Sequence, residues 1–147
     1  TLSSLIAEGA EIASQFEGSS ADLLALLLKT WWERVGDTPV AGIHKVVIAE
    51  VRNFPELAQF YADEVIQPAH RLFEGVVQRG IDRGEFRSVD TASVAHAVMA
   101  PMIFLMLHKH SFGACPVQGA NVDPKATLMA HADLMLHGLQ RHAGASR

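Results

Sequence analysis

The sequence predicts an all-α protein of about six helices, and three observations support this. Apolar residues recur at three- and four-residue spacings through most of the 147 residues. Prolines, glycines and capping residues separate those stretches. The single β-branched run, residues 46–48, has no partner strand, and a lone strand would leave its backbone donors and acceptors unpaired. A chain of this length is expected to form one domain.

The first two helices are expected at residues 2–16 and 21–35. In the first, apolar side chains follow one face and glutamates the other, which is the pattern of an amphipathic helix. The turn Gly18-Ser19-Ser20 separates the two, with Ser20 as a candidate cap. The second stretch is apolar around most of its circumference and should be largely buried.

The middle of the chain predicts one short and one long helix. Pro39 begins the helix at 39–53, because proline is favoured in the first turn. Pro55 begins the longer helix at 55–83, which Pro68 should kink by removing the bond to the carbonyl of Glu64. Gly84 stands where a left-handed residue commonly ends a helix.

Two further helices are expected at residues 90–109 and 124–140. The first is the most apolar segment of the chain, and Pro101 is expected to introduce a second kink there. The dipeptide Asp123-Pro124 marks the start of the second, after a polar loop at residues 111–122. The apolar run at 92–107 spans about 24 Å, short of the roughly 30 Å of a bilayer core, so a buried helix is favoured over a membrane span.

Composition narrows the function. A net charge of −4 with unclustered cations makes these residues a poor DNA-binding surface. A single cysteine, Cys115, excludes an internal disulfide and fits a reducing, cytoplasmic compartment. The start lacks both a secretory signal and an initiator methionine, so we expect that the beginning of a longer chain was removed or left out.

Sequence motifs for catalysis are missing, which favours a protein that is not an enzyme and needs no cofactor. There is no Gly-x-Ser-x-Gly elbow, phosphate loop or His-Glu-x-x-His helix. No two of the eight histidines lie three or four residues apart, so no metal site is expected on one helical face. The nearest metal candidate combines His108, His110 and Cys115, for which ordinary surface or core roles are the simpler interpretation.

Aromatic and methionine side chains are concentrated in a way that suggests an apolar cavity, although ordinary core packing is the alternative. Kinked helices pack imperfectly and leave room between them. The expected apolar ligand contacts are Trp31, Tyr61, Met99 and Met102. His70 or His96 is the expected polar contact, because each interrupts an otherwise apolar helix and needs a hydrogen-bond partner if it is buried.

Two segments resemble the C-terminal effector domain of TetR-family transcriptional regulators. One is Val47-Ile48-Ala49-Glu50-Val51-Arg52-Asn53-Phe54-Pro55-Glu56-Leu57-Ala58-Gln59-Phe60-Tyr61, followed by Glu64-Val65-Ile66. The other runs from Leu72 and ends in Gly80-Ile81-Asp82-Arg83-Gly84-Glu85-Phe86-Arg87, followed by Val89-Asp90. The resemblance is best over residues 47–95 and only architectural elsewhere.

The resemblance implies a cytoplasmic homodimer in which residues 90–109 and 124–140 form a four-helix bundle with their symmetry mates. In the family, a helix-turn-helix domain binds operator DNA, and a small molecule in the C-terminal domain tilts the connecting helix. No recognition-helix segment precedes Thr1 in these residues, so residues 1–147 resemble the ligand-binding and dimerisation domain alone.

Three hypotheses follow. The first is a ligand-sensing, dimerising domain of a TetR-like repressor that responds to an apolar or aromatic effector. The second is a dimerisation-only interaction domain with a solid core, which an internal cavity of at least roughly 300 Å³ would exclude. The third is an enzyme or metal-binding protein that uses His108, His110 and Cys115, and metal analysis of the purified protein tests its metal form.

Overall fold

The computed structural model describes residues 1–115, 118–119 and 121–141, and in this part the fold is all-α, as the sequence predicts. Its α-helices are α1 (Leu2–Gln15), α2 (Ser20–Trp31), α3 (Val40–Glu50), α4 (Pro55–Tyr61), α5 (Gln67–Asp82), α6 (Thr91–Lys109) and α7 (Pro124–Leu139). Two π-helical turns, Trp32–Gly36 and Ala62–Ile66, and a 3₁₀ turn, Phe112–Ala114, complete the elements. The β-branched run at residues 46–48 lies in α3, which confirms the helical interpretation.

The long helix predicted at 55–83 is divided into α4, the π-helical turn Ala62–Ile66 and α5. Pro68 explains why the backbone changes here, because it has no N–H to donate to the carbonyl of Glu64. That carbonyl instead accepts a hydrogen bond from Ser3 Oγ of α1 at 3.4 Å. The π-helical turn Ala62–Ile66 therefore helps to attach α1 to the α4–α5 segment. At Pro101, by contrast, α6 continues as an α-helix.

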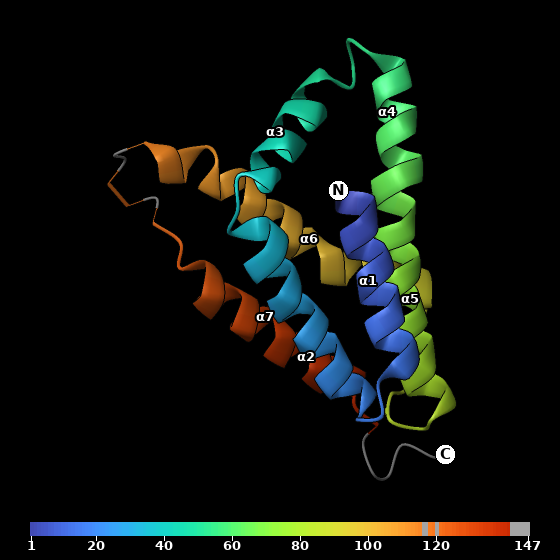
Figure 1. Ribbon diagram of the computed structural model, residues 1–147. Helices are drawn as coiled ribbons and strands as arrows, with labels where there is room; N and C mark the ends of the chain where they lie inside the picture. The colour runs from blue at the N-terminus through green and yellow to red at the C-terminus, as the bar shows by residue number, and fades with distance from the viewer. Residues whose placement is uncertain (116–117, 120, 142–147) are drawn as a thin grey trace.

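The helices pack around α5 and α6, which contact each other and most other elements. In Figure 1, α1 runs beside α5, with its first turns next to the π-helical turn Ala62–Ile66, α2 lies beside α7, and α6 crosses behind α1 and α2. α3 and α4 diverge from these helices at the end of the molecule away from the C-terminus. The fully buried core contains leucines of α2, valines of α5 and apolar residues of α6. Its main members are Leu23, Leu24, Leu28, Val76, Val77, Val98 and Leu105.

Glycines and Phe86 shape the connection from α5 to α6. Gly84 has φ +73°, a left-handed conformation that L side chains rarely adopt, as expected from its position after the helix. The buried ring of Phe86 lies directly over Gly80, where an added Cβ would come within 2.1 Å of Cδ2. Packing therefore explains the Gly-x-x-x-Gly-Glu-Phe pattern without any chemical role for it.

α6 and α7 leave large apolar side chains in contact with solvent. Phe104 is 52% exposed, Met129 74% and Leu134 72%. α6 and the 3₁₀ turn that follows it form a helical segment, Thr91–Ala114, that by length and composition could cross a membrane. This segment is longer than the apolar run at residues 92–107 from which a buried helix was predicted. Five of the α6 side chains are nevertheless core residues packed within the bundle. Packing within the bundle does not explain why the large apolar side chains on the outer faces of α6 and α7 are exposed.

Candidate functional site

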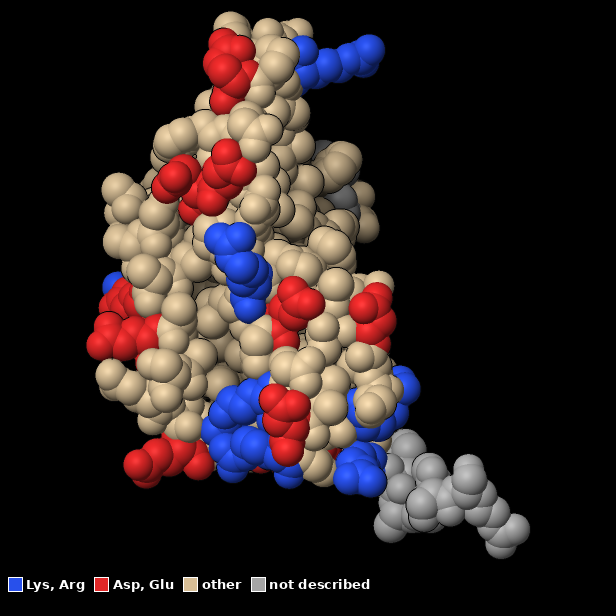
Figure 2. Space-filling view, turned by 90° about the vertical axis from the view of Figure 1, so that its right-hand side faces the viewer, with Lys and Arg blue, Asp and Glu red and all other residues tan. Residues whose placement is uncertain are grey.

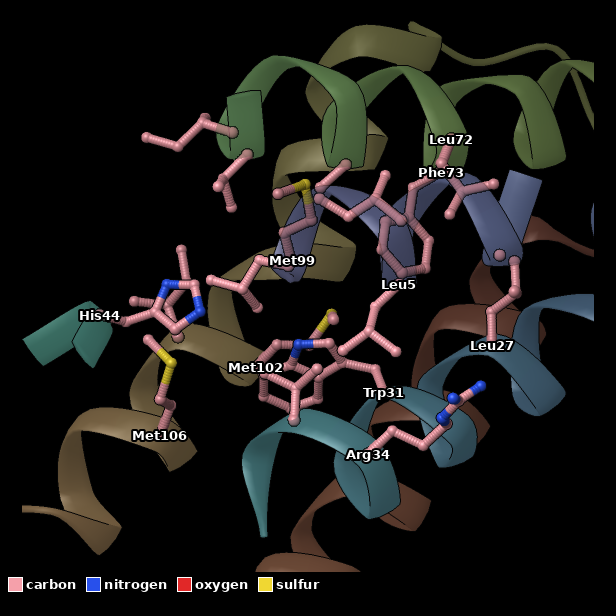
Figure 3. Close-up of a pocket in the computed structure, with 18 of the residues that line it drawn as sticks. Leu5, Leu27, Trp31, Arg34, His44, Leu72, Phe73, Met99, Met102 and Met106 are labelled. Carbon is pink, nitrogen blue, oxygen red and sulfur yellow. The ribbon is translucent and has the colours of Figure 1, made fainter. Parts of the chain in front are cut away.

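An apolar cavity of about 220 Å³ lies between α1, α2, α3, the α4–α5 segment and α6 (Figure 3). Its walls contain leucines and isoleucines of α1, Leu27 and Trp31 of α2, Arg34 of the π-helical turn Trp32–Gly36, and His44 of α3. α6 contributes three methionines, and the α4–α5 segment contributes Tyr61, Leu72 and Phe73 among others. Figure 3 shows His44 on one side of this space and Leu27 with Arg34 on the other. Both π-helical turns supply lining residues, among them Val35 and Val65.

The methionines make this wall adaptable. Met99, Met102 and Met106 are spaced three and four residues apart on α6, so that they share one face of the helix. Methionine side chains are unbranched and polarisable, and they adjust readily to the shape of a partner. The cavity is thus suited to apolar and aromatic groups.

Charge at the cavity is confined to one ion pair. Within the described residues, Glu8 and Arg34 are the only charged members of the lining, and their Oε2 and Nη1 atoms are 2.6 Å apart. The pair joins α1 to the end of the α2 segment and is about half exposed. Because the two charges compensate each other, the space offers no net charge to a ligand.

His44 and Tyr61 form the polar part of the site. The two side chains are hydrogen-bonded through His44 Nδ1 and the Tyr61 hydroxyl, with ring centroids 5.3 Å apart and planes inclined by 76°. His44 is only 6% exposed, and its Nε2 has no hydrogen-bond partner among the described residues. Burial lowers the pKa of His44 from its ordinary value of 6.5, so the imidazole is neutral near pH 7.

Sequence reasoning did not identify His44 as a site residue. A signal was present, because Ala41, His44 and Val47 follow a three-residue spacing and are the buried positions of α3. The partner, however, lies 17 residues away on another helix, and only the turn between α3 and α4 brings the two side chains together. Local spacing cannot reveal that contact.

Four of the six candidate ligand residues line the cavity: Trp31, Tyr61, Met99 and Met102. His70 and His96 lie elsewhere, between α5 and α6, where their rings are 4.2 Å apart. His70 Nε2 is 3.0 Å from the carbonyl oxygen of Ala92, and His96 is exposed. Neither His70 nor His96 lines this cavity, so a polar contact to a ligand there has to come from other residues.

A second hollow is an open groove of about 580 Å³ between α1 and α5. Its lining mixes small side chains of α1 with Arg71 and Arg79 of α5. Arg79 is already engaged, since its guanidinium donates to Ser20 Oγ at 2.7 Å and to the carbonyls of Phe16 and Gly18 at 2.9 Å. Arg79 thus fixes the α1–α2 turn through these hydrogen bonds and has a structural role in the groove. In Figure 2, basic and acidic side chains are interspersed on the face shown, without a large basic patch.

Metal ligands are not gathered in the part of the chain that the structure describes. No group of three or more histidine, cysteine or acidic side chains there could hold an ion. Cys115 is exposed, whereas His110 has a buried Nε2 for which the described residues provide no hydrogen-bond partner. These residues do not form a centre comparable to the apolar cavity.

Comparison with known proteins identifies the class of this fold. The sequence profile described as "Tetracyclin repressor-like, C-terminal domain" matches residues 17–114. This chain therefore belongs to the TetR family of transcriptional regulators and contains its C-terminal domain. No match was found among curated proteins.

A solved structure supports the fold. The chain is similar to a protein from Mesorhizobium loti MAFF303099 assigned to the TetR family of transcriptional regulators, solved at 1.54 Å resolution. The TM-score is 0.66 and the sequence identity 17%, and the match covers 92% of this chain and 64% of the other. At this identity the similarity establishes the fold, and this chain spans about two thirds of the length of that regulator.

Proposed function

We propose that this chain is the ligand-sensing, dimerising domain of a TetR-like transcriptional repressor, and that an apolar or aromatic small molecule releases the repressor from operator DNA. The observation that carries the proposal is the apolar cavity of about 220 Å³ at the meeting point of five helical segments. An empty cavity in a packed interior costs stability, and a ligand that fills it recovers the lost contacts. For comparison, an apolar cavity of about 150 Å³ is sufficient to bind benzene.

α1 is the element best placed to transmit binding. It has no fully buried residue, yet Leu2, Leu5, Ile6, Gly9 and Ile12 contribute to the cavity wall. A ligand therefore contacts a helix whose side chains are all at least partly exposed. If the ligand binds one position of α1 better than another, each 1.4 kcal/mol of difference changes the ratio of the two states about tenfold.

DNA contact belongs, in this proposal, to a helix-turn-helix domain outside these 147 residues, as in other family members. The family resemblance supports this division of labour, and the mixed charges in Figure 2 agree with it. In the complete protein, an effector that moves α1 changes the distance between two DNA-reading domains. A gel-shift assay with the complete protein and its operator should show weaker DNA binding when the effector is added.

The exposed faces of α6 and α7 support a homodimer. Phe104, Met129 and Leu134 are all more than half exposed in a single chain. A symmetric partner covers the same patch on both copies and removes this apolar surface from water. We accordingly propose a four-helix bundle of α6 and α7 from two copies, in a cytoplasmic protein without enzymatic activity, cofactor or membrane attachment.

Ligand binding is tested most simply by tryptophan emission and thermal unfolding. A panel of small hydrophobic compounds is added to the chain, and the emission spectrum and melting temperature are recorded. The substitution Trp31→Phe should abolish the emission change, because Trp31 lines the cavity, while Trp32 is 3% exposed in the core. If no compound in the panel changes either signal, the sensing function is wrong.

A second candidate function is a domain that only dimerises. The observation that favours it is the cavity size, because about 220 Å³ is below the roughly 300 Å³ at which ligand pockets usually begin. Under this alternative the chain dimerises but no compound raises its melting temperature. The same compound panel, together with the molar mass in solution, separates the two functions.

A further inference from the structure

The buried imidazole of His44 provides a second clue to the ligand. A buried polar atom without a partner costs free energy, so such atoms are rare in folded proteins. His44 Nε2 is one of two such side-chain atoms among the described residues, and it is the one whose residue lines the cavity. A ligand in the cavity can satisfy it.

The hydrogen bond with Tyr61 determines what His44 offers. If the Tyr61 hydroxyl donates to Nδ1, then Nε2 of the neutral ring carries the hydrogen and remains a free donor. If instead Nδ1 donates to the hydroxyl oxygen, two groups lack partners, namely the phenol hydrogen and Nε2, since no other hydrogen bond of Tyr61 is found in the described part of the chain. The first arrangement leaves fewer polar groups unsatisfied. His44 is then a donor that needs an acceptor.

Charge compensation at the cavity selects against ionised ligands. Arg34 is paired with Glu8 at 2.6 Å, and the lining is otherwise apolar apart from Thr30, His44 and Tyr61. A carboxylate would have to leave water without gaining an unpaired cation, which is costly. Burial also lowers the pKa of His44, so the imidazole provides no positive charge near pH 7.

The volume limits the size of the ligand. An apolar cavity of about 150 Å³ holds benzene, so in proportion about 220 Å³ holds roughly nine non-hydrogen atoms. That corresponds to one six-membered ring with a short substituent. The three methionines of α6 can adjust their rotamers around such a ring.

Building on the proposed sensing function, we propose that the effector is a neutral molecule of about one ring that carries a hydrogen-bond-accepting oxygen, and that His44 Nε2–H donates to this oxygen. The apolar wall selects the ring, and the single buried donor selects the oxygen. Tyr61 acts through His44 as a positioning residue, because its hydroxyl fixes which ring nitrogen carries the hydrogen.

Three probes of nearly equal shape and of the expected size test this assignment. Acetophenone carries an accepting carbonyl, α-methylstyrene replaces that oxygen with a methylene group, and benzoate replaces the neutral group with a carboxylate. Dissociation constants for the 147-residue chain are measured by isothermal titration calorimetry at neutral pH. We expect acetophenone to bind about tenfold more tightly than α-methylstyrene, because only acetophenone satisfies the donor, and benzoate to bind most weakly.

Variants connect the preference to His44. His44→Leu should bind both neutral probes with similar constants, while His96→Leu, at an exposed residue outside the cavity lining, should keep the preference for acetophenone. If His44→Leu does not fold, ¹⁵N NMR of the imidazoles in the unchanged chain replaces it. Acetophenone, but not α-methylstyrene, should then shift the Nε2 resonance of His44.

The outcomes separate this inference from the function on which it rests. If all three probes bind equally well, or if benzoate binds best, the assigned ligand class is wrong although the cavity still binds small molecules. If the preference for acetophenone persists in a folded His44→Leu variant, the assignment to His44 is wrong. If none of the probes binds but larger hydrophobic compounds stabilise the chain, the inference on size and class fails and sensing stands, whereas failure of every compound overturns both.

Discussion

Replacing Leu134 by lysine should break the dimer and leave the fold of each chain unchanged. Leu134 is 72% exposed in a single chain, so a charged side chain there contacts water and does not enter the core. In the proposed four-helix bundle the same position is buried against the partner. The substitution therefore separates the stability of the interface from the stability of the protomer.

The expected size of the effect follows from the exposed surface. Full burial of a leucine side chain contributes about 1.5–3 kcal/mol, so the exposed share of Leu134 corresponds to about 1–2 kcal/mol. Two-fold symmetry presents this side chain twice, which gives about 2–4 kcal/mol for the dimer. The dimer dissociation constant should rise by about 30-fold or more. The desolvation of two lysines adds to this value.

Sedimentation velocity over a range of protein concentrations measures the dissociation constant, and circular dichroism checks that the helix content is unchanged. Val46→Lys is the matched control, since Val46 is 61% exposed on α3, which is not one of the two helices of the proposed interface. We expect Val46→Lys to remain dimeric. A dimer that tolerates Leu134→Lys but dissociates in Val46→Lys would place the interface on α3 and refute the assignment to α6 and α7.

Three other predictions concern the core and the cavity. Gly80→Ala should lower the free energy of unfolding by about 1–3 kcal/mol in chemical denaturation, because the new Cβ would overlap the ring of buried Phe86, and an unchanged midpoint would contradict this packing. Acidification should destabilise the chain below about pH 6.5, because burial lowers the pKa of His44 and the unfolded state therefore binds a proton at this residue before the folded state does. The melting temperature of His44→Leu should depend less on pH in this range. An equal dependence in both proteins would argue against a buried neutral imidazole. Trp31→Phe should remove the ligand-induced change in emission while the signal of Trp32 remains, and a response that survives would place the ligand elsewhere.

The helices could be predicted from the sequence because their boundaries have local causes. Asp123 caps α7 by accepting hydrogen bonds from the backbone of Lys125 and Ala126, and Gly84 ends the α5 region with a positive φ. The absence of a partner strand was sufficient to place residues 46–48 in a helix. The two π-helical turns were not predicted, because the apolar spacing of an α-helix continues through both of them.

The cavity could be predicted only in part, because the same apolar pattern describes a core residue and a lining residue. Met102 is 5% exposed and contributes to both. The histidines show the limit most clearly. His44 lies in the apolar helix α3 and His70 in the amphipathic helix α5. The packing of α6 against α5 gives His70 a backbone partner, whereas His44 Nε2 at the cavity has none among the described residues. That difference is tertiary and cannot be read from spacing.

NMR of the methionine methyl groups tests most directly whether the apolar cavity binds a small molecule. The chain has five methionines, of which Met99, Met102 and Met106 line the cavity, while Met129 is exposed on α7 and Met135 packs against the core. With ¹³C-labelled methyl groups and acetophenone as the probe, we predict that the three α6 signals shift together and saturate, and that the two α7 signals stay in place. Shifts confined to the α7 methyls, or no shift at any concentration below the solubility limit, would contradict it.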